Sequence, residues 1–157
     1  MRVIPVTNSI LAIGNSEKTN DLTHLKLQKI LYFLHGHYLA ETGEPLIDDN
    51  FEAWPYGPVV PSLYSELKHY GPRPIDEYIF ERKTGEEKPG AYFISKEHRP
   101  EFWDILKKVW AKYNKYSASQ LSSMTHEPGT PWSISPKNFA IDNELIKRHF
   151  KNKTNLL

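Results

Sequence analysis

Histidines and acidic residues are the side chains of this chain that could support metal binding or acid–base chemistry. His35 and His37 lie two apart in an apolar run that predicts a helix, so their rings point about 200° apart and do not share one metal ion. Histidines on such helices usually lie at the edge of the core. The run His126-Glu127-Pro128 begins like a zinc-binding helix motif, but proline ends the helix that would align a second histidine. We expect no metal site.

Catalytic motifs are absent from the sequence. It contains no glycine-rich phosphate loop and no nucleophile-elbow motif. The residues 48–50, Asp-Asp-Asn, fit the hydrogen-bonding habits of a turn better than a carboxylate pair. The chain has no cysteine, which excludes disulfides, thiol nucleophiles and iron–sulfur clusters. No motif therefore argues for catalysis or for a cofactor, although a site could still be assembled from residues far apart along the chain; a hydrolase that uses His126 with Glu127 is the catalytic alternative.

The charge of the chain gives no reason to expect a polyanionic partner. The 157 residues carry 20 Lys and Arg against 19 Asp and Glu, a net charge of +1. A group of cations lies near the end of the chain, and helices commonly carry cations near their C-terminus because the helix dipole favours them there. Nucleic acid is therefore not the expected partner, and DNA binding through these cations remains an alternative. These cations are Lys147, Arg148, Lys151 and Lys153. The N-terminal apolar run is too short to span a membrane, so we predict a cytoplasmic protein with no membrane contact.

The strongest helix signal covers residues 23–43. Thr23 is the expected N-cap, and Gly43 is the expected left-handed stop. Apolar residues recur at helical spacing and predict one buried stripe, with Lys26 and Lys29 off that stripe. The stripe consists of Leu27, Ile30, Leu31, Leu34 and Tyr38.

Other local signals place the remaining elements. A first helix is expected to start after Thr7 or Asn8, and later helices to start near Pro61, Pro100, Ser117 and Asp142. Residues 127–132 read as a turn, and residues 75–95 as a β-hairpin with a polar tip. The tail 151–157 is expected to fray. The sum is a mainly α-helical α+β fold, with about six helices around one core and a small β element, in a single domain over residues 1–157.

The stretch FEAWPYGPVVPSLY, residues 51–64, is unusually rich in proline and aromatic residues. Pro55, Gly57 and Pro58 predict a sharp turn. We expect Phe51, Trp54 and Tyr64 to pack this corner against the 23–43 helix. Tyr56, at the tip of the turn, is the aromatic residue that we expect to be exposed.

Three blocks of residues in this order resemble the hallmark of the Panacea domain, the family of SocA-like antitoxins and GepA-like phage-associated proteins. The resemblance covers roughly residues 8–150. The matching residues are Lys26, Leu27, Gln28, Lys29, Tyr32 and Phe33, then Phe51, Ala53, Trp54, Gly57, Pro58, Val59 and Tyr64, and finally Leu121, His126 and Trp132.

The resemblance implies an antitoxin of a type II-like toxin–antitoxin system. Such a protein would not be an enzyme and would have no cofactor. It would neutralise a toxin, encoded by an adjacent gene, by direct protein–protein contact and without a small-molecule substrate. Two related roles stay open: a proteolytic adaptor for the toxin, and a stand-alone phage or prophage accessory protein that binds a host or phage protein. The oligomeric state is not readable from the sequence.

Residues of the family motif are our candidates for partner binding. A shared scaffold should keep its core residues, so the apolar members are expected to pack inside the protein. Polar members are harder to place in a core, because a buried Lys or His needs a partner. The candidates are Lys26, Gln28, Lys29, Tyr32, Trp54, Tyr56, Gly57, Pro58, His126 and Trp132.

Overall fold

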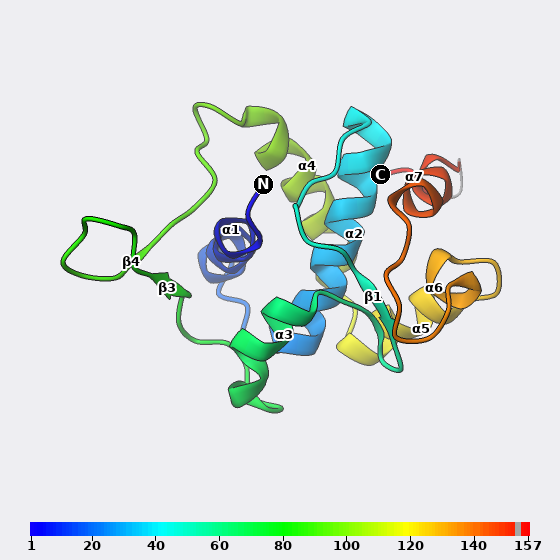
Figure 1. Cartoon of the computed structure of the whole chain (residues 1–157), viewed down its shortest axis with the longest axis horizontal. Helices are drawn as coiled ribbons and strands as arrows, with labels where there is room; N and C mark the ends of the chain where they lie inside the picture. The colour runs from blue at the N-terminus through cyan, green and yellow to red at the C-terminus, as the bar shows by residue number, and fades with distance from the viewer. Residues whose placement is uncertain (153–154) are drawn as a thin grey trace.

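The long helix α2 (His24–Thr42) lies in the middle of the molecule, with the other helices packed around it (Figure 1). The computed structural model describes residues 1–152 and 155–157. Helix α2 contacts α1, α3, α4, α5, α7 and strand β2, and residues 26–39 are all buried. The expectation of a single buried stripe was therefore wrong: neighbouring helices cover the flanks of α2 as well, and Lys26 and Lys29 are buried with the stripe.

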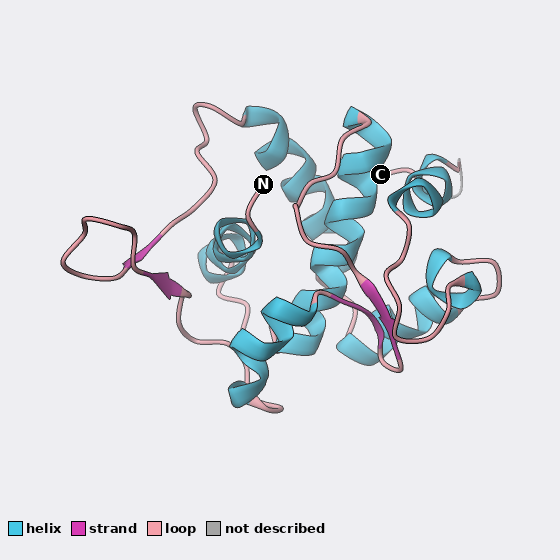
Figure 2. Cartoon of the chain, viewed as in Figure 1, coloured by secondary structure: helices cyan, strands magenta, loops and turns pink. Residues whose placement is uncertain are grey.

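Figure 2 shows that helices dominate the fold and that the strands are short. The described residues form seven α-helices, one 3₁₀ turn and two antiparallel two-stranded sheets, which confirms the mainly helical α+β class. The elements around α2 are α1 (Val3–Ser16), β1 (Glu52–Trp54), β2 (Gly57–Val59), α3 (Pro61–Leu67), η1 (Lys68–Tyr70), β3 (Phe80–Glu81), β4 (Gly90–Ala91), α4 (Pro100–Tyr113), α5 (Ala118–His126), α6 (Pro131–Ile134) and α7 (Asn143–Lys151).

Helix ends agree with the local signals in the sequence. The Thr23 side chain accepts a hydrogen bond from the Lys26 amide, and Gly43 ends α2 with a φ of 81°. Ser117 and Gln120 form the expected capping box of α5. Pro61 and Pro100 occupy the first turns of their helices, where a missing N–H leaves no hydrogen bond unmade.

Two elements differ from the prediction. Helix α1 begins at Val3 rather than after Thr7 or Asn8, because Pro5 falls in its first turn and is compatible with a helix there. Asn8 has a tertiary role instead of a capping role: its side chain bonds the backbone N–H and C=O of Ile79 and the carbonyl of Tyr92. The segment expected to be only a turn also contains the short helix α6, which Thr130 caps.

The hairpin predicted in residues 75–95 is present as β3–β4, which projects to one side of the molecule (Figure 1). Its paired part is only two residues long on each side. The prediction of a frayed tail falls partly on residues 153 and 154, which lie outside the described residues, so Lys153 of the predicted basic group lies outside them as well. Helix α7 ends at Lys151.

His35 and His37 are inside the core and not at its edge, which corrects the prediction. Their rings do diverge as expected: His35 Nε2 lies 2.8 Å from Asn143 Oδ1 on α7, and His37 Nε2 lies 2.9 Å from the Tyr113 hydroxyl on α4. Burial lowers the pKa of His35 to about 4 and that of His37 to about 3. Both histidines are therefore neutral core residues at pH 7.

Candidate functional site

The stretch of residues 51–60 forms a hairpin whose tip projects beside α5 and α6. In β1–β2, Ala53 is opposite Pro58 and Trp54 is opposite Gly57, so Pro55 and Tyr56 form a two-residue loop. Gly57 has a φ of 103°, a conformation that favours glycine. We call residues 54–57 the Tyr56 turn. The edge of β1 that does not face β2 pairs with the segment 138–140. There the Ala53 amide donates a hydrogen bond to the Phe139 carbonyl.

Side chains of α5 and α6 bond the backbone of the Tyr56 turn. Three successive carbonyl oxygens of the turn each accept a hydrogen bond from a different side chain. Trp132 Nε1 donates to Trp54 (2.7 Å), His126 Nε2 to Pro55 (3.0 Å) and Ser122 Oγ to Tyr56 (2.9 Å). These bonds restrict the turn from one side.

Side chains of α2 bond the second strand of the hairpin and the residue that follows it. Lys29 Nζ donates to the Pro58 carbonyl at 3.1 Å. The Gln28 amide both donates to and accepts from the backbone of Val60, at 3.1 and 3.0 Å. Polar residues of the motif therefore hold the backbone of the proline-rich hairpin, a role that the sequence alone did not suggest.

Tyr56 is the exposed end of this arrangement. Its side chain is 68% exposed, in agreement with the prediction, although the carbonyl of the same residue is bonded by Ser122. Trp54 is half-buried: its ring packs edge-on against Tyr64, and its Nε1 donates to Glu52. The turn thus presents one aromatic side chain to solvent from a backbone that side chains of α2, α5 and α6 hold.

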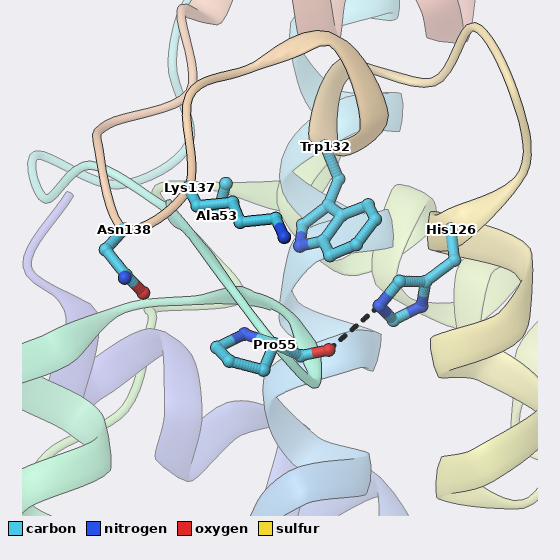
Figure 3. A pocket seen from close by; sticks show the side chains of 6 residues that line it. All are labelled: Ala53, Pro55, His126, Trp132, Lys137 and Asn138. Atoms are coloured by element: carbon cyan, nitrogen blue, oxygen red, sulfur yellow. Dashed lines mark hydrogen bonds between the residues drawn. The ribbon is translucent and has the colours of Figure 1, made fainter.

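A first pocket, which we call the Trp132 pocket, has a volume of about 250 Å³. Figure 3 shows the rings of His126 and Trp132 on one side of it and Pro55 below. The two rings contact each other edge to face, with centroids 3.8 Å apart. Lys137 and Asn138 complete the wall and are residues that the sequence did not single out.

A second pocket, the Lys29 pocket, lies on the other side of His126 and has a volume of about 490 Å³. It is lined by residues of α2, the Tyr56 turn and α5: Leu25, Lys29, Tyr56, Ala118, Ser119, Ser122, Ser123 and His126. Sequence reasoning missed Ser122; its position four residues before His126, on the same face of a capped helix, was the available signal.

Lys29 is a buried basic residue in the lining of the Lys29 pocket. Its side chain is 1% exposed, and burial lowers its pKa to about 7. The only acceptor for its ammonium among the described residues is Pro58, and no described carboxylate lies within ion-pair distance.

Two of the candidates lie away from both the Tyr56 turn and the pockets. Lys26 is also 1% exposed, but its Nζ lies 2.7 Å from Asp21 Oδ2 and 2.7 Å from the Asn114 carbonyl. Tyr32 is buried against Phe51 and Phe150, and burial raises the pKa of its hydroxyl. The remaining eight candidates meet around the hairpin.

His126 is held by backbone atoms on both sides of its ring. Nε2 faces the Pro55 carbonyl, and Nδ1 lies 2.5 Å from the Ser122 carbonyl of its own helix. Glu127 is the exposed C-cap of α5. In residues 1–152 and 155–157, no three His, Asp or Glu side chains are arranged to hold a metal ion. No helix in the same residues is long and apolar enough to cross a membrane.

Comparisons with known proteins match the hairpin and the helices that hold it. The family model described as "Antitoxin SocA-like, Panacea domain" matches residues 27–133. Antitoxin SocA of Caulobacter vibrioides (strain NA1000 / CB15N) is 35% identical over 115 residues, which are 72% of this chain and 59% of that relative's length. No solved structure matches. Because the family model covers more than half of the chain, this protein belongs to the family of SocA-like antitoxins that carry the Panacea domain.

Proposed function

We propose that this protein is an antitoxin that neutralises a protein toxin, encoded by an adjacent gene, by binding it directly through the Tyr56 turn. Family membership supports the antitoxin role, and the relative in Caulobacter vibrioides has that name. The observation that carries the proposal is the exposed Tyr56 side chain on a backbone held by α2, α5 and α6.

A fixed aromatic side chain suits protein recognition. Tyrosine buries a large area while few torsions are lost, and a turn that is already ordered loses little further entropy on binding. The two pockets beside the turn offer places for side chains of the toxin. Both ring nitrogens of His126 face carbonyl oxygens, so we assign this residue to holding the turn and not to catalysis.

Growth rescue by co-expression tests the function. Expression of the neighbouring gene should arrest growth, and co-expression of this protein should restore it. Tyr56→Ala should weaken toxin binding about ten- to thirty-fold and reduce rescue, with an unchanged melting temperature. The matched control is Phe80→Ala, because Phe80 is 60% exposed on the other hairpin, and this variant should bind as the wild type does.

The outcomes separate the related roles. Loss of toxin from the cell only when the protein is present would favour an adaptor for proteolysis, whereas binding with stable toxin levels favours simple inhibition. Failure of the intact, folded protein to rescue growth would contradict the antitoxin proposal, and the stand-alone accessory role would then take its place. Equal losses for Tyr56→Ala and Phe80→Ala would contradict the choice of the Tyr56 turn.

A further inference from the structure

The charge of Lys29 has no opposite charge beside it in the part of the chain that the structure describes. An ammonium group has three N–H donors, and the Pro58 carbonyl at 3.1 Å accepts from only one of them. Ionised side chains that are this deeply buried are normally paired, because desolvation strongly disfavours an isolated charge. Lys26, equally buried three residues earlier on the same helix, obeys this rule through Asp21.

The wall that contains Lys29 is open to a ligand. The Lys29 pocket, about 490 Å³, falls in the usual size range of binding pockets. Hydroxyl groups of Ser119 and Ser123 line it and have no partner within the described chain. Ala118 and Ser119, the first two residues of α5, add the positive end of a nine-residue helix. No acidic side chain of the described residues lines the pocket.

We propose that the Lys29 pocket receives the carboxylate of an acidic side chain of the toxin, which pairs with the Lys29 ammonium. This inference rests on the proposed function, because it names the chemistry by which the partner is recognised. The pocket adjoins the exposed Tyr56, so a toxin that covers the turn would bring its own side chains to the pocket.

A carboxylate fits this pocket better than a phosphate group does. Phosphate sites generally use arginine clusters or glycine-rich backbone loops, and the pocket lining contains neither. A single lysine matches the single negative charge of an Asp or Glu side chain, and hydroxyl donors can satisfy the remaining carboxylate lone pairs. Burial that lowers the pKa of Lys29 to about 7 is consistent with a site whose opposite charge arrives with the partner.

Affinity measurements with charge-removing variants test this inference. The variant Lys29→Met should weaken toxin binding at least about thirty-fold and should flatten the salt dependence of the affinity. The variant Gln28→Met is the matched control, because it releases the same hairpin at Val60 without changing a charge. Its affinity loss should be smaller, and its salt dependence should stay that of the wild type.

Double-mutant cycles should then identify the acid. Each Asp→Asn and Glu→Gln variant of the toxin is combined with Lys29→Met, and exactly one toxin position should show strong coupling. Binding by folded Lys29→Met within about threefold of the wild type, or coupling to no acidic position, would overturn the inference even if the wild type binds and neutralises the toxin. The proposed function would survive that result.

A second measurement does not require the toxin. Sodium acetate, compared with sodium chloride at equal ionic strength, should produce a saturable change in the ¹³Cε and ¹Hε NMR signals of Lys29, and Lys26 should not respond. Absence of that response would overturn the carboxylate site. A response to acetate combined with unchanged toxin binding by Lys29→Met would assign the pocket to a small free carboxylate and overturn the toxin as its source. Absence of toxin binding by the wild type itself would overturn the proposed function.

Discussion

Lys26 and Lys29 lie three residues apart on α2, are equally buried, and have very different surroundings. Lys26 bonds the carboxylate of Asp21 and the carbonyl of Asn114, so it ties α2 both to the segment before it and to the end of α4. Among the residues that the structure describes, Lys29 bonds only the Pro58 carbonyl, and it lines a pocket. Burial alone therefore does not assign a role to a charged residue; the groups around it do.

The comparison separates a region that is complete in the free protein from one that we propose a partner completes. At Lys26 every strong interaction is internal, so substitutions there should change stability. At Lys29 the desolvated charge costs free energy in the free protein and would be compensated by a ligand. Substitutions at Lys29 should therefore separate stability from binding.

The largest effect on stability is expected for Gly57→Ala, a substitution that disturbs the surroundings of Lys29 and not those of Lys26. The new Cβ would lie 2.6 Å from Lys29 Cε and 2.8 Å from Thr125 Oγ1, on a residue with a φ of 103°. Lys29 is buried and has little room to shift, so we expect a loss of about 3 kcal/mol in the free energy of unfolding, measured by urea denaturation. Gly129→Ala is the control: its φ is 82° but nothing lies within 4 Å, so about 1 kcal/mol is expected. Equal losses would show that the contact with Lys29 is unimportant.

The second effect is the pH dependence of stability. Burial lowers the pKa of Lys29 from its ordinary 10.5 to about 7, so between these values the unfolded chain binds a proton that the folded chain does not. Stability should therefore fall as the pH decreases from 9.5 to 7.5, by about 1.4 kcal/mol per pH unit at most, and the fall should level off below pH 7.

The control for this pH dependence is Lys29→Met, which should lose this slope. Other titratable groups near Lys29 are His24 on α2, Tyr56 on the turn and His126 on α5, and they are retained in the variant. The difference between the two curves therefore reports Lys29. An identical slope in both proteins would contradict an unpaired lysine.

The smallest effect is expected for Lys26→Met, which tests the other side of the comparison. Two charge-assisted hydrogen bonds are lost and the Asn114 carbonyl loses a donor, while the buried charge disappears. We expect a net loss of about 2 kcal/mol in the free energy of unfolding, with toxin affinity unchanged. A loss of affinity without a loss of stability would reverse the roles that we assign to the two lysines.

Local signals in the sequence predicted much of the fold. Caps and breakers such as Thr23, Gly43, Pro61 and Ser117 act through neighbours within four residues, so their effect is readable without tertiary information. The start of α1 was misplaced because the side chain of Asn8 is used 71 residues away, at Ile79. A capping residue and a tertiary hydrogen-bonding residue look the same in sequence.

The candidate site was predictable in its residues but not in its arrangement. The motif named Gln28, Lys29, His126 and Trp132, and nothing in their spacing showed that all four bond one hairpin. Exposure of Tyr56 followed from the turn chemistry of its proline and glycine neighbours. Ser122 is not a motif residue and was missed, although its spacing of four residues from His126 places it on the same face of α5.

The sequence by itself determined the helical class, most of the helix ends, the turn that exposes Tyr56 and membership of the antitoxin family, because these depend on neighbouring residues and on a linear motif. Tertiary structure decided which of two similar lysines is paired. The partners of Lys26 are Asp21, five residues away, and Asn114, 88 residues away. The Lys29 pocket is likewise built from segments that are distant along the chain, but it brings no carboxylate to Lys29 from the described residues. Desolvation and pairing depend on such neighbours in space, and helical periodicity places a residue on a face without stating what covers that face.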